Sequence, residues 1–276
     1  MESRMSLLTV VCVAMLVCGC ATATRHHNSS VVQYLYPDSV DHVETTAIPR
    51  LALPLKVGVA FVPEELAGNQ DLTERDKMEL MKEVGRHFQK YEFVKSLELI
   101  PSAYLRARGG FTNLDQIRTM YGVDIIALLS YDQTQFTDEG LASISYWTLV
   151  GAYIVRGEKN DTHTMVDAAV YDIQSRKMLF RAPGVSHIKS KATLVNLSEQ
   201  LRADSARGFK EASQDLVANL DLQLGPLMEE IKASPAEYEV IYRAGYSGGG
   251  SLDGCYIIFF SILGGNCLWR KWKRHA

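Results

Sequence analysis

Short apolar runs alternate with segments of helical spacing through the first half of the chain. Three compact apolar runs suit buried strands, and they cover residues 56–62, 93–100 and 123–130. Between the first two runs, Leu80, Val84 and Phe88 recur at the spacing of one helix face, behind a capping-box pattern at residues 71–74. Residues 113–121 read as a second, shorter helix. The pattern therefore predicts a β-α-β-α-β order for this half.

The second half is richer in aromatic and β-branched residues. We expect an antiparallel meander with strands at residues 143–155, 162–173 and 178–187 and turns at residues 157–161 and 174–177. A long amphipathic helix follows, and its apolar face is traced by Leu194, Leu197, Leu201, Ala206, Phe209, Leu216 and Leu220. The whole order, β-α-β-α-β-β-β-β-α, predicts an α/β sandwich with a mixed sheet.

The element order covers one domain at residues 55–233, which is long enough to bury its own core. Its pattern resembles the N-terminal α/β domain of TolB and the periplasmic domain of CsgG-type lipoproteins. Residues 20–54 are polar with scattered prolines and read as a tether, and residues 234–251 read as a linker with a Gly-rich cleavage region.

The N-terminus reads as a lipoprotein signal peptide over residues 1–19. Arg4 supplies the positive charge, and the apolar run at residues 7–17 is too short to span a hydrocarbon core of about 30 Å comfortably. The sequence Val17-Cys18-Gly19-Cys20 resembles the bacterial lipobox, which assigns Cys20 as the lipidated first residue of the mature chain. The alternative is an ordinary secretory signal with incidental cysteines. By the same resemblance, the residue after Cys20, an alanine rather than an aspartate, implies sorting to the outer membrane.

The C-terminus repeats the membrane theme. Residues 252–269 form an apolar stretch that would reach about 27 Å as a helix, and the basic residues 270–276 after it are expected to stay cytoplasmic. The stretch is preceded by Gly248, Gly249, Gly250 and Ser251. Glycine costs about 1 kcal/mol relative to alanine in a helix, so this boundary is expected to fray and to expose peptide bonds to a protease. The alternative is a permanent C-terminal anchor.

This order of glycine cluster, short apolar helix and basic terminus is similar to the GlyGly-CTERM sorting signal, which the rhomboid-type protease rhombosortase recognises. A lipobox and such a tail together resemble the rhombotarget lipoprotein family. The resemblance implies processing partners (lipoprotein processing enzymes and a rhomboid-type protease) and a precursor held in the inner membrane. It also implies a mature form anchored by its lipid in the bacterial envelope, at the outer membrane or cell surface. A second Gly-Gly pair at residues 264–265 leaves the cleavage position open.

Composition narrows the remaining chemistry. All the cysteines lie at residues 12, 18, 20, 255 and 267, so the central domain has none for catalysis, zinc or disulfides. Loss of the signal and tail removes five of 29 Lys/Arg and two of 32 Asp/Glu, which leaves a net charge of −6 and argues against a nucleic-acid partner.

No catalytic or metal-binding signature stands out, and we predict no cofactor. The candidates are the pair His26-His27, the Ser-x-x-Lys pattern at Ser186 and Lys189, the acids Asp124, Asp132, Asp138 and Glu139, and the isolated His87 and His163. Adjacent histidines point in different directions, and Ser-x-x-Lys sits at a strand end without partners. We expect the four acids to be solvated loop residues, although paired carboxylates could also serve in acid–base catalysis or hold a divalent cation.

Tyr146 and Trp147 sit together in a predicted strand and read either as core or, if they face outward, as a partner surface. We therefore expect a non-enzymatic envelope lipoprotein, held by its lipid anchor and, as a precursor, by its C-terminal helix, that binds or organises an envelope partner. The competing hypotheses are a hydrolase with dispersed active-site residues and a subunit of an oligomeric lipoprotein assembly. A cleft collecting Asp132, Asp138 and a histidine would favour the hydrolase.

Overall fold

The chain is described by a computed structural model over residues 22–37, 47–63, 72–139, 158–193, 195–234 and 236–246. Its strands are β1 Thr22–Asn28, β2 Arg50–Leu53, β3 Leu55–Phe61, β4 Val94–Ile100, β5 Ile125–Glu139, β6 Glu158–Asp172, β7 Met178–Ala192 and β8 Glu239–Tyr242. Its helices are α2 Val31–Leu35, α3 Glu74–Gln89, the 3₁₀ turn η1 Ser102–Tyr104, α4 Gly110–Tyr121 and α6 Leu197–Ala233.

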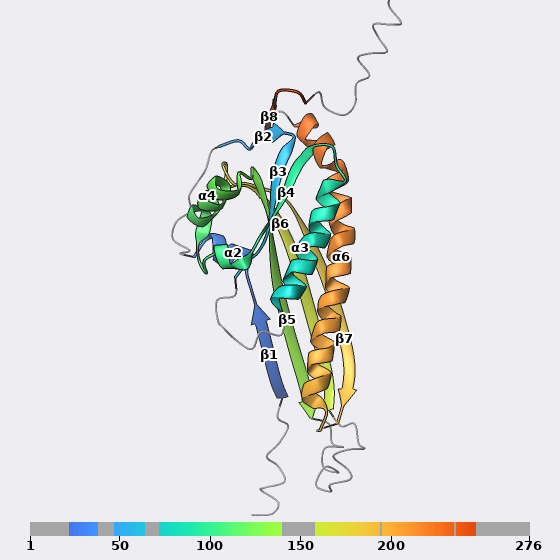
Figure 1. Cartoon of the computed structure of the whole chain (residues 1–276). Coiled ribbons are helices and arrows are strands. Elements are labelled where there is room, and N and C mark those ends of the chain that lie inside the picture. The colour runs from blue at the N-terminus through green and yellow to red at the C-terminus, as the bar shows by residue number, and fades with distance from the viewer. Residues whose placement is uncertain are drawn as a thin grey trace, which may run out of the picture.

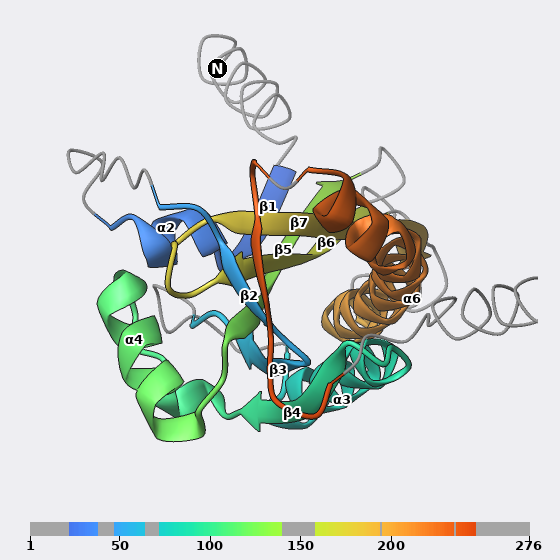
Figure 2. The same ribbon diagram turned by 90° about the horizontal axis from the view of Figure 1, so that it is seen from above.

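The main sheet is mixed, as the sequence predicts. Its order is β4-β3-β5-β6-β7, with β3 parallel to β4 and β5, and with β5, β6 and β7 antiparallel to one another. The long strand β5 changes its neighbour along its length: its first residues pair with β3, and residues 132–138 pair with β1. The sheet therefore has an upper part that contains β3 and a lower part that contains β1 (Figure 1). A separate parallel pair, β2 and β8, lies across the upper end (Figure 2).

The two faces of the sheet are covered differently. α3 and α6 pack on one face along a core that includes Phe61, Phe88 and Leu216. α2 and α4 pack on the other face, but only against its upper part, around residues such as Leu114 and Ile126 (Figure 1). Among the described residues, the lower part of this second face is therefore left open to solvent.

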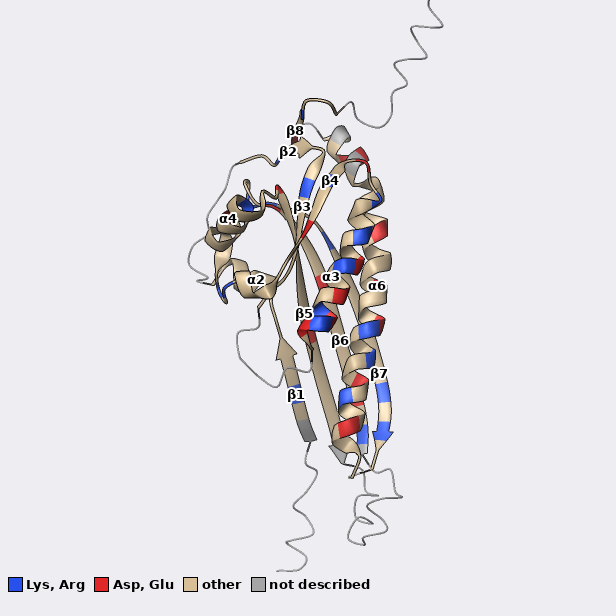
Figure 3. Ribbon diagram, in the orientation of Figure 1, with Lys and Arg blue, Asp and Glu red and all other residues tan. Residues whose placement is uncertain are grey.

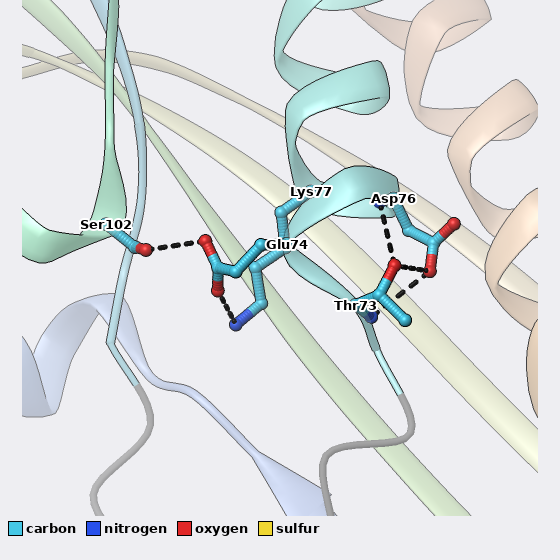
Figure 4. Close-up of polar contacts among 5 residues, drawn as sticks. All are labelled: Thr73, Glu74, Asp76, Lys77 and Ser102. Carbon is cyan, nitrogen blue, oxygen red and sulfur yellow. Dashed lines mark hydrogen bonds and ion pairs between the residues drawn. The ribbon is translucent and has the colours of Figure 1, made fainter.

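Helix α3 begins at a capping box that lies two residues later than the sequence pattern predicts. Thr73 is the N-cap: its hydroxyl accepts from the Asp76 backbone, and the Asp76 carboxylate accepts from the Thr73 backbone at 3.1 Å (Figure 4). The predicted pattern uses Glu74 as the closing acid. In the structure Glu74 instead accepts from the Ser102 hydroxyl at 2.7 Å and from Lys77 at 3.1 Å, which ties the helix start to η1 (Figure 4).

α6 closes the free edge of β7. The Asp215 carboxylate accepts the backbone N–H of Val185 at 2.9 Å, and the Asn219 amide donates to the carbonyl of Pro183 at 2.7 Å. Beneath the same helix, Gln135 donates to the Leu201 carbonyl at 2.9 Å, so the lower interface of α6 with the sheet is polar. Side chains of α6 thus occupy hydrogen-bonding groups that an edge strand would otherwise offer to another chain.

Several boundaries differ from the sequence predictions. The tether expected over residues 20–54 contains β1, α2 and β2, and the linker expected over 234–251 contains β8. The three strands gain their structure by pairing with distant strands, and α2 packs into the core that it shares with α4. The turn expected at 157–161 is mostly β6, and β6 pairs with β5 rather than with residues 143–155, which lie outside the described residues. The signal peptide and the C-terminal tail also lie outside them. No helix in the described part of the chain is long and apolar enough to cross a membrane.

Candidate functional site

The exposed lower face of the sheet carries a row of histidines. The strand register places His26 of β1 opposite Thr134 of β5, Thr134 opposite His163 of β6, and His163 opposite His187 of β7. Residues directly opposite one another point to the same side of a sheet, and neighbouring strands lie about 4.8 Å apart. One rung across four strands therefore presents three imidazoles to solvent; we call it the histidine rung.

His163 and His187 form the tightest part of the rung. Their rings stack with centroids 4.0 Å apart and an interplanar angle of 19°. Asp161, two residues before His163 on the same face of β6, places its Oδ1 3.2 Å from the His163 Nε2 and also hydrogen-bonds the His187 Nε2. The three side chains are 36–52% exposed, so the cluster is open to solvent on its outer side.

A second histidine–carboxylate pair lies at the other end of the rung. The His26 Nε2 is 3.0 Å from the Asp132 Oδ1, and this contact joins the short edge strand β1 to β5. The same strand is fixed at its end by Ser29, whose backbone N–H donates to the Tyr131 carbonyl at 2.8 Å. The register of β1, and with it the position of His26, is thus set by several contacts to one strand.

Apolar and basic side chains border the histidine rung. Phe136, Met165 and Val185 are 40, 36 and 60% exposed, and the Phe136 ring meets the His163 ring edge-on at 6.2 Å. Lys189 lies directly opposite Asp161 in the register. Figure 3 shows basic residues gathered at the lower end of β7, whereas α3 and α6 carry both signs along their length. The face is therefore a mixed surface of imidazole, carboxylate, ammonium and exposed apolar groups.

A cavity of about 440 Å³ lies on the opposite, helix-covered side, between α3 and α6. Three acids of α3 line it, namely Asp76, Glu79 and Glu83, and Lys210 faces them from α6. Its hydroxyl groups come from Tyr131, Ser205 and Ser213, and no histidine is among its lining residues.

The residues singled out from the sequence are distributed over several environments. Asp124 accepts from Arg243 at 2.7 Å and from the Lys56 backbone at 2.9 Å, and this contact joins the upper end of the sheet to the chain after β8. His87 contacts Asp221 at 2.6 Å and links α3 to α6. Both contacts connect separate elements of the fold.

The Ser-x-x-Lys pattern does not form a catalytic pair. The Ser186 hydroxyl donates to the Gly208 carbonyl at 2.8 Å beneath α6, whereas Lys189 is exposed on the other face of β7. Their odd spacing within one strand separates them across the sheet. The side chains of Asp138 and Glu139 lie outside the described part, as do Cys20, Tyr146, Trp147 and the residues Gly248, Gly249, Gly250 and Ser251.

Buried titratable groups lie away from the histidine rung. The Nε of Arg181 donates to both carboxylate oxygens of Asp167 at 2.8 Å, yet burial raises the pKa of the Asp167 carboxyl above its ordinary value. Burial also raises the pKa of the Tyr34 hydroxyl, which donates to Asn113 at 3.0 Å between α2 and α4. Asp167 thus joins β6 to β7, and Tyr34 joins α2 to α4.

The histidine rung is the feature that sequence reasoning misses. His163 has no evident partner in the sequence, and His26 falls within the expected tether. Two features of the sequence could have indicated the rung. His163 alternates with buried positions in a predicted strand, and the predicted turn brings residues 178–187 back beside that strand. The register that aligns His163 with His187 depends on the irregularity between Val170 and Tyr171, which the sequence pattern does not reveal.

No protein-family model matches this chain, and no curated protein matches it either. Among solved structures, the chain is similar to a dodecamer of a PelC point variant from Paraburkholderia phytofirmans, at 11% identity over 73% of this chain and 96% of that one, with a TM-score of 0.30. It is also similar to a putative neuraminyllactose-binding hemagglutinin homolog from Helicobacter pylori, at 8% identity over 70% and 97%, with a TM-score of 0.37. Scores at this level carry no argument about function.

Proposed function

We propose that this protein is a non-enzymatic lipoprotein of the bacterial envelope, anchored through Cys20, that loses its C-terminal tail and then presents its exposed sheet face to another envelope component. The observation that supports this proposal is where the described part of the folded body begins and ends. β1 starts at Thr22, only two residues after Cys20, and Thr22 pairs with Asp138 near the last residue of β5.

The C-terminal end of the body lies at the opposite end of the same strand. Arg243 contacts Asp124, the residue before β5, at 2.7 Å. β5 has 15 residues, which corresponds to a length of about 46 Å. The nine residues from Arg243 to Leu252, where the predicted apolar stretch begins, can span at most about 32 Å even when fully extended. The predicted lipid and the predicted tail therefore leave the body from opposite ends, farther apart than the intervening chain can bridge.

This separation gives a physical reason for removing the tail. With both attachments in one membrane, the long axis of the body would have to lie along the membrane surface. The lipid alone, at about 0.8 kcal/mol per buried CH₂ over several acyl chains, suffices to hold the protein. Once the tail is lost, the body can stand on β1 with the histidine rung facing sideways, accessible to a neighbouring envelope protein.

The fold supports this proposal at a finer level as well. Helices cover both faces of the upper mixed sheet, which is the arrangement expected of an α/β sandwich of the TolB or CsgG type.

Intact-mass analysis of the protein from its native host tests the anchoring and the processing together. We expect a mature chain that begins at an acylated Cys20 and ends near Gly248, Gly249, Gly250 or Ser251. Replacing the three glycines with leucines should block tail loss, whereas the same replacement at Gly264 and Gly265 should leave the mature mass unchanged. A mature chain that still contains Arg274 would refute the processing, and an unmodified Cys20 would refute the lipid anchor.

A further inference from the structure

We propose that Asp161, His163 and His187 form a binding site for a divalent transition-metal ion of the Zn²⁺ class. Their ligand atoms all lie within 4.8 Å of one another, and they form the only such group among the residues that the structure describes. Two imidazole nitrogens and one carboxylate oxygen are a common ligand set for zinc, with water completing a tetrahedral shell. The proposal does not depend on the lipid anchor or on tail removal.

The antiparallel hairpin of β6 and β7 preorganises the three donors. His163 and His187 are direct register partners, so the backbone fixes the separation of their Cα atoms. Their stacked rings direct both Nε2 atoms toward Asp161 Oδ1. Zinc bonds to imidazole nitrogen are about 2.0–2.1 Å long, so small side-chain rotations suffice to surround an ion with these three donors.

The donor types select the class of metal. Imidazole suits zinc, copper and nickel, whereas magnesium and calcium prefer shells made of oxygen atoms. A single carboxylate beside two imidazoles offers too few oxygen ligands for the latter ions. We therefore expect Zn²⁺, Cu²⁺ and Ni²⁺ to bind, and Mg²⁺ and Ca²⁺ not to compete at equal concentration.

The surroundings make the site exchangeable rather than permanent. Lys189 lies directly across from Asp161 in the strand register, and its positive charge repels a bound cation. The cluster is also open to water on its outer side. Phe136 packs edge-on against His163 and limits the movement of that ring. A metal on this face would bridge β6 and β7 and leave open coordination positions, which a histidine or carboxylate of a docking partner could fill.

Titration of the full-length, untagged protein in detergent with Zn²⁺, against a chromophoric zinc indicator, tests the site. We expect one ion per chain, and at least about tenfold weaker binding for each of His163→Gln and His187→Gln. His26→Gln is the matched control, because His26 belongs to the same rung but lies outside the cluster. Lys189→Gln should bind severalfold more tightly, since it removes the opposing charge.

The Cu²⁺ complex gives an independent readout, because its electron paramagnetic resonance spectrum reports the number of nitrogen ligands. We expect two nitrogens in the wild-type protein and one in either His163→Gln or His187→Gln. Circular dichroism establishes that these surface variants remain folded. The proposal is overturned if both variants bind Zn²⁺ like the wild type, or if His26→Gln weakens binding as much as they do.

Discussion

The backbone of α6 lies directly against Gly184 of β7, and replacing Gly184 with alanine tests how that helix is held. A Cβ atom at this position would lie 2.1 Å from the Ala212 carbonyl oxygen and 2.3 Å from the Leu216 backbone nitrogen. Both obstacles are backbone atoms of the helix, so no side-chain rotation can relieve the overlap. The helix has to move away from β7.

The size of the effect follows from that movement. Restoring an ordinary contact of 3.4 Å from 2.1 Å requires a shift of about 1.3 Å along that contact. Leu216, Leu220 and Leu224 of α6 are fully buried. A gap of 0.5–1 Å already removes about a quarter to a half of the van der Waals attraction in each packing contact. Full burial of one leucine contributes about 1.5–3 kcal/mol. If each of the three leucines loses a third of that contribution, the expected destabilisation is roughly 1.5–3 kcal/mol.

Urea denaturation followed by circular dichroism measures this change in the free energy of unfolding. Gly225→Ala in the same helix is the matched control, because nothing lies within 4 Å of its added Cβ. For Gly225→Ala we expect the free energy of unfolding to rise by no more than about 1 kcal/mol, because alanine favours the helix more than glycine does. The proline that follows reduces this gain. If the free energy of unfolding of Gly184→Ala lies within about 0.5 kcal/mol of the wild-type value, the close approach of α6 to β7 does not limit stability and the reasoning fails.

Two further predictions concern single polar contacts. The Ser102 hydroxyl lowers the pKa of Glu74 below its usual 4.5, so this contact stabilises the fold above pH 4.5 and the stabilisation is lost as the pH falls through the lowered pKa. Ser102→Ala should therefore cost up to about 1 kcal/mol at pH 7 and less at pH 3, measured by thermal unfolding at both values; an equal cost at both would contradict it. Asp215→Ala leaves the Val185 N–H at the edge of β7 without its acceptor, and we expect concentration-dependent self-association in light scattering; a variant that scatters like the wild type would argue that the edge is blocked by other means.

Local patterning predicted the elements that carry the core. The runs at 56–62 and 93–100 correspond within one residue to β3 and β4, and the helix ending at Tyr121 stops at Gly122, which takes the left-handed conformation with φ 65°. These elements bury apolar residues at a fixed period, so the period alone reveals them. The short strands β1, β2 and β8 were missed because they are held by pairing with distant strands, a contact that local spacing does not reveal.

For the candidate site, too, some features follow from the sequence and others only from the structure. The chain ends, the cysteine positions and the net charge are evident from the sequence, and they supplied the anchoring and processing hypotheses, which remain predictions. The partnership of His26, His163 and His187 was not readable, because the three residues lie in segments far apart along the chain. Asp124 illustrates the converse: its residue type made it a candidate for chemistry, and its contact with Arg243 assigns it to holding the upper end of the sheet.

The sequence by itself determined which segments bury apolar surface and which residues are available for lipid attachment, charge and metal binding, since these properties depend on residue type and local spacing. Only the tertiary structure decided which strands pair and in what register. A shift of one residue in that register would move His163 or His187 to the opposite face of the sheet. Register depends on the summed packing of α6, the bulge in the β6–β7 pairing and the contacts of β1 with β5, and no single segment of the chain carries that information.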